Sequence, residues 1–128
     1  MSIKYRCISN NPLFREKSFP GLEYHETDIL SLFWLISSEV ASGSKLLSHP
    51  LTGSIRPDIT PYKTVLISCE KGEPDCTSVL LMEKAIRYTE DLYKLREVPL
   101  YERWGEAAKA DFQMIDYSII KQALEVSA

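Results

Sequence analysis

The sequence has few of the features that mark exported, membrane-spanning or disulfide-rich proteins. Only three of its 128 residues are cysteine, an odd number that is too small for a disulfide framework. The first residues contain no apolar stretch with a small-residue cleavage site, so no signal peptide is predicted. The longest apolar run, residues 32–36, is far shorter than the ~20 residues that a bilayer span requires. We therefore expect a cytoplasmic protein that contacts no membrane.

An excess of positive charge is also lacking. The chain carries 15 Lys and Arg against 18 Asp and Glu, for a net charge of −3, which argues against nucleic-acid binding. Hydrophobic residues make up 45% of the chain and charged residues 26%, as in ordinary globular domains. No repeat or linker divides the sequence, so we expect a single domain over residues 1–128.

Metal-binding and redox motifs are missing as well. Cys69 and Cys76 do not have the CxxC spacing of zinc and thioredoxin-type sites. His49 has no second ligand at helical spacing, and a hydrogen bond within its own loop is the simpler expectation. Cys69 would need a neighbouring base to act as a nucleophile. We therefore predict no metal and no cofactor, and we assign no catalytic residue.

Strand and helix patterns alternate along the chain. The predicted strands are Ile3–Ser9, Leu22–His25, Lys45–Ser48 and Thr64–Ile67, the last being the strongest because its apolar run is continuous. The first strand ends at the turn residues Asn10 and Asn11, which precede a proline. This alternation predicts an α/β fold with a small, mostly parallel sheet of three to four strands layered with helices.

Helical periodicity predicts three helices. The first begins at a cap on Thr27 or Asp28, ends near Ala41, and has so wide an apolar arc that we expect most of its sides to be covered. Two C-terminal helices are predicted at about residues 77–96 and 107–126. Their expected inner faces are Leu81, Ala85, Tyr88, Leu92 and Leu95 in the first helix, and Phe112, Ile115, Ile119, Ala123 and Val126 in the second.

The connection between these two helices carries Tyr101 and Trp104, large side chains of the kind that dominate protein interfaces. A small sheet also offers limited area to cover two long helices. We therefore expect the protein to form a homodimer, with Tyr101 and Trp104 at or near the contact.

The segment from His49 to Lys63 is the most informative part of the sequence. Its prolines and Gly53 prevent regular structure, and long loops inside small domains are usually functional. Arg56 can bind a carboxylate or phosphate with two parallel hydrogen bonds, and the segment is locally positive. The candidate ligand- or partner-binding residues are Asn10, Asn11, His49, Thr52, Gly53, Ser54, Arg56, Tyr62 and Lys63.

Two interpretations of these residues stay open. The loop is either a site for a small anion or a partner, or a proline-stiffened structural loop in which Arg56 and Asp58 act as local caps. Asn10 and Asn11 either hydrogen-bond a ligand at the end of the first strand or simply form its turn. The sequence does not decide whether this asparagine pair meets the loop in space.

Several blocks resemble the GrdX family of small proteins. They are the Asn-Asn-Pro-Leu block at 10–13, the stretch at 45–57 with His-Pro-Leu-Thr-Gly-Ser at 49–54, and the stretch at 60–66. Proteins of that family are encoded beside the glycine, sarcosine and betaine reductase components of anaerobic, amino-acid-fermenting bacteria. The resemblance implies an accessory role beside reductase components, and it brings no catalytic residues with it.

We therefore expect a non-catalytic accessory protein that binds a small anion or a partner at the loop of residues 49–63. The alternative is a small enzyme that acts on a carboxylate or phosphate compound at the same loop. In that case Arg56 would bind the anion and His49 would serve as the acid–base group.

Overall fold

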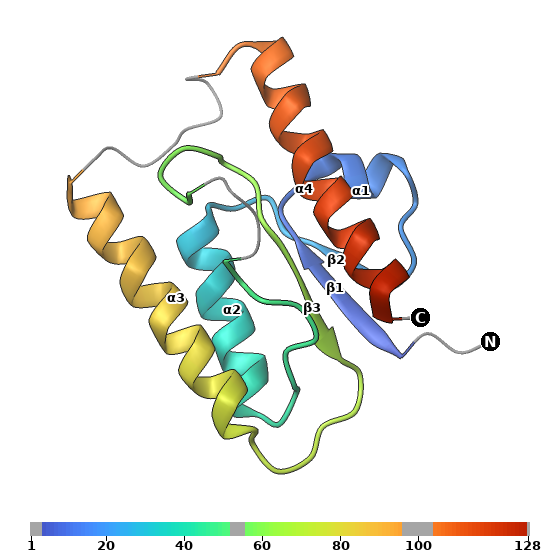
Figure 1. Cartoon of the computed structure of the whole chain (residues 1–128), viewed down its shortest axis with the longest axis vertical. Helices are drawn as coiled ribbons and strands as arrows, with labels where there is room; N and C mark the ends of the chain where they lie inside the picture. The colour runs from blue at the N-terminus through green and yellow to red at the C-terminus, as the bar shows by residue number, and fades with distance from the viewer. Residues whose placement is uncertain (1–3, 52–55, 96–103, 128) are drawn as a thin grey trace.

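The computed structural model describes residues 4–51, 56–95 and 104–127 (Figure 1). The candidate residues Thr52, Gly53, Ser54 and Tyr101 lie outside this part of the chain. In chain order the elements are β1 (Tyr5–Ser9), α1 (Pro12–Glu16), β2 (Leu22–Tyr24), α2 (Ile29–Ala41), β3 (Thr64–Ser68), α3 (Cys76–Leu95) and α4 (Glu106–Ser127).

The described strands form one sheet in the order β2-β1-β3. β1 is parallel to β2 but antiparallel to β3. The fold is α/β as predicted, but the expectation of a mostly parallel sheet was wrong. The continuous apolar run of β3 reports burial on both faces, which helices provide here, and it does not encode strand direction. Residues 45–48 add one isolated bridge, Leu46 to Ile67, in place of the predicted strand.

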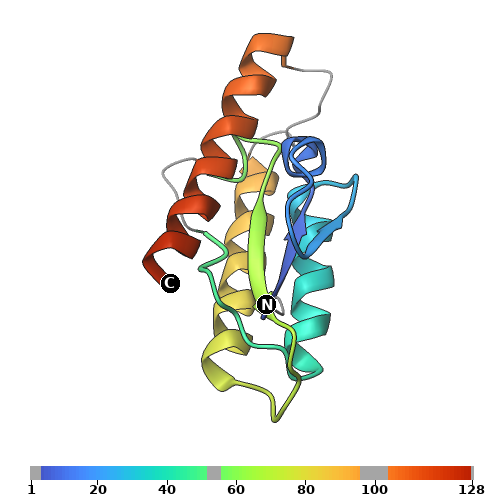
Figure 2. The ribbon, with the colours of Figure 1, turned by 90° about the vertical axis from the view of Figure 1, so that its right-hand side faces the viewer.

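Helices cover both faces of the sheet. Figure 2 shows β3 between α4 on one side and α2 on the other, and α3 packs beside α2. Strand alternation sends Ile8, Val65 and Ile67 into the core under α2 and α3. Cys7 and Leu66 point into the second core, under α1 and α4. Burial raises the pKa of the Cys7 thiol, so this cysteine acts as a small apolar core residue.

Local sequence signals determine both ends of α2. Asp28 caps its start, with a side-chain oxygen 2.7 Å from the Ser31 amide. Gly43 follows the end of α2 with a φ of +114°, a backbone conformation that residues other than glycine rarely adopt. The side chains of Ile29, Phe33, Ile36 and Val40, which share one face of α2, are buried. However, Trp34 is 54% exposed and Leu35 43% exposed, so the expectation that most sides of α2 are covered was wrong.

The buried faces of the C-terminal helices match the prediction only in part, at Ala85. α3 buries Ser78, Met82, Ala85, Ile86 and Thr89. In contrast, Leu95 is 82% exposed and Tyr88 39% exposed. In α4, Asp116 and Ile120 are buried whereas Ile115 is 40% exposed. The polar members of these faces are paired, as when Ser78 accepts a hydrogen bond from the Leu46 amide. Locating the buried face of a helix from its apolar residues alone therefore gives the wrong face when buried polar residues have hydrogen-bond partners.

Gly43 provides a direct test of this fold. A Cβ atom at residue 43 would lie 2.3 Å from the carbonyl oxygen of Gly72, in addition to the strain of a positive φ. We expect Gly43→Ala to lower the free energy of unfolding by roughly 2–4 kcal/mol in urea denaturation. Gly72→Ala is the matched control, because a Cβ there meets nothing within 4 Å. Equal stability of the two variants would contradict the close approach of these backbones.

Candidate functional site

Asn10 ties the end of β1 to the end of the loop of residues 49–63. Its side-chain amide donates to the carbonyl oxygens of Thr27 and Pro61, at 2.8 and 2.9 Å. Its carbonyl oxygen accepts from the Lys63 amide at 2.7 Å. The side chain is fully buried, so each of these bonds replaces a lost bond to water. Asn10 and the loop therefore meet, and Asn10 holds the loop at Pro61 and Lys63.

Asn11 joins β1 to two helices. Its side-chain oxygen accepts from the Leu13 amide at 3.0 Å and so caps α1. Its side-chain nitrogen donates to the Gln113 carbonyl at 2.9 Å and to Asp116 Oδ2 at 3.0 Å, both on α4. α1 itself was not predicted, although an asparagine followed by a proline is a known helix-start signal. Asn11 therefore places α4 relative to the end of β1.

A chain of hydroxyl groups runs beside Asn11 to a buried carboxylate. The Thr64 hydroxyl donates to Asp116 Oδ2 at 2.6 Å. Because its single hydrogen is used there, Ser9 Oγ must be the donor in the 2.7 Å bond between Ser9 and Thr64. Ser9 Oγ in turn accepts from the Asn11 amide at 2.9 Å. All these bonds point toward Asp116, an arrangement in which each strengthens the next.

Asp116 and Lys63 are the charged groups of this cluster. Burial raises the pKa of the Asp116 carboxyl, and the hydrogen bonds from Thr64 and Asn11 oppose that shift, as does the charge of Lys63. Burial likewise lowers the pKa of Lys63, and Asp116 opposes that shift. The positive charge of Lys63 is therefore balanced inside the protein by Asp116, and the side chain is buried rather than displayed on the surface.

The outer part of the loop carries the exposed candidates. His49 is exposed, and its Nδ1 accepts from the Leu51 amide at 3.0 Å, the bond within the loop that the sequence favours. Arg56 Nη2 lies 3.1 Å from Asp58 Oδ2, with the Arg56 side chain 42% exposed and the Asp58 side chain buried. Asp58 thus orients Arg56 at the surface while neutralising part of its charge.

Two further hydrogen bonds join the loop to the C-terminal helices. Tyr62 is buried, and its hydroxyl accepts from Gln113 Nε2 of α4 at 3.1 Å. On the other side, the Tyr93 hydroxyl of α3 donates to the Pro57 carbonyl at 3.3 Å. The loop is thus bonded to both C-terminal helices. In the described ranges, no group of three or more His, Cys, Asp or Glu could hold a metal ion.

Sequence reasoning missed Ser9, Thr64, Gln113 and Asp116. Asp116 is the member that a sequence signal could have identified. It lies four residues after Phe112 and four before Ile120, so it occupies a position on an apolar stripe where a carboxylate is unexpected. The partners of Asp116 come from segments far away in the chain, and no local pattern identifies them.

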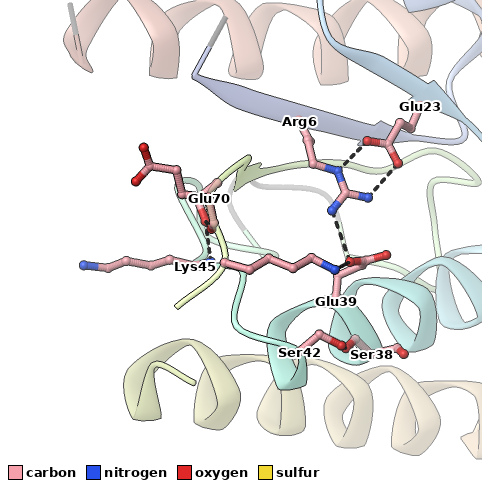
Figure 3. Close-up of polar contacts among 9 residues, drawn as sticks. Arg6, Glu23, Ser38, Glu39, Ser42, Lys45 and Glu70 are labelled. Atoms are coloured by element: carbon pink, nitrogen blue, oxygen red, sulfur yellow. Dashed lines mark hydrogen bonds and ion pairs between the residues drawn. The ribbon is translucent and has the colours of Figure 1, made fainter. Parts of the chain in front are cut away.

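A second charged cluster connects the sheet to α2 (Figure 3). Arg6 on β1 donates to both oxygens of Glu23 on β2, at 2.5 and 2.8 Å, and to Glu39 on α2 at 3.1 Å. Lys71 Nζ lies 2.9 Å from the same Glu39 oxygen. The bond from Arg6 lowers the pKa of Glu23. Bonds from Arg6 and Lys71 lower the pKa of Glu39 to about 2.

The Glu39 cluster predicts a specific acid sensitivity. An unfolded glutamate has a pKa of about 4.3, above the folded value of about 2. The stabilising contribution is therefore complete above about pH 5 and is lost as the pH falls toward 2. We expect Glu39→Gln to flatten this part of the melting temperature profile measured by circular dichroism. Glu83→Gln, on the exposed face of α3, should leave the profile unchanged, and an unchanged profile in both variants would contradict the prediction.

Asp116 is the natural residue to test in the polar cluster. Asp116→Ala leaves the Thr64 hydroxyl and the Asn11 amide without their buried acceptor and removes a negative charge that acts on Lys63. We expect the free energy of unfolding to fall by about 2–4 kcal/mol. Asp111→Ala, on the exposed face of the same helix, should change it by less than about 0.5 kcal/mol. Similar values for both variants in urea denaturation would show that the cluster does not anchor α4.

The comparison with protein families matches the amino-acid sequence to a known group. The family model of GrdX-like proteins covers residues 6–125, nearly the whole chain. The chain belongs to the GrdX-like family. The match includes the loop and most of β1 and α4, so the residues bonded to Asp116 lie within the GrdX-like region. The resemblance stated from the sequence is confirmed.

No curated protein and no solved structure matches the chain. Within the described part of this GrdX-like chain, no helix is long and apolar enough to cross a membrane.

Proposed function

We propose that this GrdX-like chain is a non-catalytic accessory protein of a glycine, sarcosine or betaine reductase system. Its working surface would be the outer side of the loop of residues 49–63. Family membership supports the association with reductase components. The observation that carries the proposed surface is the anchoring of the loop through Asn10, Tyr62 and Lys63, which presents His49 and Arg56 on a fixed base.

The chemistry of the exposed groups favours binding of an acidic group. Since His49 Nδ1 accepts a hydrogen bond from the Leu51 amide, its neutral ring carries the proton on Nε2 and offers a donor. Arg56 uses Nη2 in its bond to Asp58, and a guanidinium has further donors for a second carboxylate or phosphate. The ligand of this surface would be a small anion or an acidic side chain of a reductase component.

The buried groups favour binding over catalysis. Asp116 accepts from Thr64 and Asn11, and Lys63 is buried beside it, so these titratable groups hold the fold together. General acid–base catalysis needs a group that can reach substrate, and these two are enclosed by their own partners. An enzyme acting at His49 and Arg56 is the alternative, and it predicts turnover as well as binding.

Self-association stays a separate proposal. The Trp104 ring packs against Phe112 at 5.1 Å between centroids, so its main described contact lies within the chain. Tyr101 falls outside the described residues. A homodimer through this connection would therefore use the exposed part of Trp104 together with residues around it.

The loop surface can be tested with one conservative substitution. Arg56→Lys keeps the charge beside buried Asp58 but loses the planar fork of donors, so affinity for an acidic ligand should fall at least about tenfold. The measurement is titration calorimetry with purified reductase components, and with glycine, sarcosine, betaine, acetyl phosphate and phosphate. Arg87→Lys, on the exposed face of α3, is the matched control.

Three results would count against the proposal. If none of these ligands gives a heat of binding, the binding role is wrong. If wild type and Arg56→Lys bind with equal affinity, Arg56 takes no part in binding. Turnover of a carboxylate or phosphate compound that is lost in His49→Ala would establish the enzyme instead.

A further inference from the structure

β2 forms an open edge of the sheet. The strand order β2-β1-β3 leaves β2 with a neighbour on one side only, whereas the far edge of β3 is bonded to residues 45–48 through Leu47 and Ser48. In the parallel ladder, the Cys7 amide bonds to the Gly21 carbonyl and the His25 amide to the Ser9 carbonyl. The backbone groups of Leu22 and Tyr24 therefore point away from β1.

Three of these outward groups have no partner among the residues that the structure describes. The Leu22 amide bonds to the Phe19 carbonyl at 3.3 Å. The Leu22 carbonyl and the amide and carbonyl of Tyr24 make no hydrogen bond to the described residues. A strand edge with free donors and acceptors is a template for another extended chain.

A pocket opens beside this edge, under the face of the sheet that α2 covers. It has a volume of about 90 Å³ and is lined by Arg6, Ile8, Glu23, His25, Leu35, Ile36 and Glu39. Figure 3 shows Arg6 between Glu23 and Glu39. Arg6 is paired with both glutamates, and Lys71, which is not part of the lining, pairs with Glu39, so these charged groups already have partners. The apolar part of the lining is Ile8, Leu35 and Ile36, and Leu35 is its exposed member, at 43%.

We propose that β2 is a docking edge for an extended segment of a partner protein. The segment would add to the sheet as a fourth strand, bonded to Tyr24, and would direct a branched aliphatic side chain onto Leu35 in the pocket. Strand alternation supports this pairing, since a residue beside Glu23 faces the pocket side of the sheet. The strand residues Leu22 and Tyr24 are not part of the loop of residues 49–63, so the inference does not depend on the proposed function.

A second copy of this chain fits the edge less well. A two-fold pair of identical strands would bring Glu23 of both copies to one seam, on the same face of the sheet. Directly opposed like charges destabilise a strand pair. A different partner, with an aliphatic residue at that position, avoids the repulsion.

The test uses a proline that blocks the edge and leaves the β1 ladder intact. Tyr24→Pro removes the outward amide and places the proline ring in the path of an added strand, and prolines are tolerated on such edges. Tyr24→Ala is the matched control, because it loses the same aromatic ring and keeps the amide. The probe is a displayed library of short random peptides, from which the best binder is titrated into the 15N-labelled protein.

The expected peptide alternates aliphatic and polar residues and slows hydrogen exchange at the Tyr24 amide. It should bind wild type and Tyr24→Ala alike, and Tyr24→Pro at least about tenfold more weakly. Leu35→Asp should also weaken binding, whereas Leu80→Asp on the exposed side of α3 and Arg56→Lys in the loop should not.

Several outcomes would overturn the proposal. The first is that the library yields no peptide that binds. The second is that the peptide binds Tyr24→Pro and Leu35→Asp with the same affinity as wild type. Light scattering that shows a dimer in wild type and a monomer in Tyr24→Pro would assign the edge to a second copy instead.

Discussion

The fold depends most on the buried carboxylate of Asp116. It accepts hydrogen bonds from Thr64 on β3 and Asn11 after β1, so a single side chain on α4 is bonded to both strands at one end of the sheet. A buried carboxylate is costly unless its oxygens are hydrogen-bonded and a positive charge lies nearby. Lys63 supplies that charge. The position of α4 is therefore fixed by direction-dependent hydrogen bonds in addition to the apolar contacts of Ile120.

Contacts with the rest of the fold also hold the described residues of the loop, 49–51 and 56–63. A proline-containing loop loses few conformations on folding, but its backbone still needs partners for its polar groups. Asn10 supplies them at Pro61 and Lys63, and Tyr93 supplies another at Pro57. The exposed groups of the loop are consequently presented by a base that belongs to the core. For the binding role proposed for the loop, such a base would reduce the entropy lost when a ligand arrives.

Local signals predicted most of the elements, though not α1, and distant contacts decided how they are arranged. A cap at Thr27 or Asp28 identified the start of α2 because a cap acts within a few residues. The direction of β3 depends on where the chain returns to the sheet, which its own apolar run does not encode. The inner face of α3 was misplaced because Ser78 and Thr89 are buried with hydrogen-bond partners. Asn10 was a candidate from its place at a strand end, but its partners were visible only in three dimensions.

The polar cluster around Asp116 and the outer edge of β2 differ in how completely their polar groups are used. In the cluster, the hydrogen-bonding groups of Asn10, Asn11, Ser9 and Thr64 bond to one another and to backbone groups. Groups that are satisfied in this way stabilise and position the fold, and they have little left for a ligand. At the β2 edge, backbone groups of Leu22 and Tyr24 point outward beside a pocket with an apolar wall. Recognition is therefore expected where the fold leaves bonds unmade, at the sheet edge and on the outer side of the loop, whereas the buried cluster between them provides rigidity.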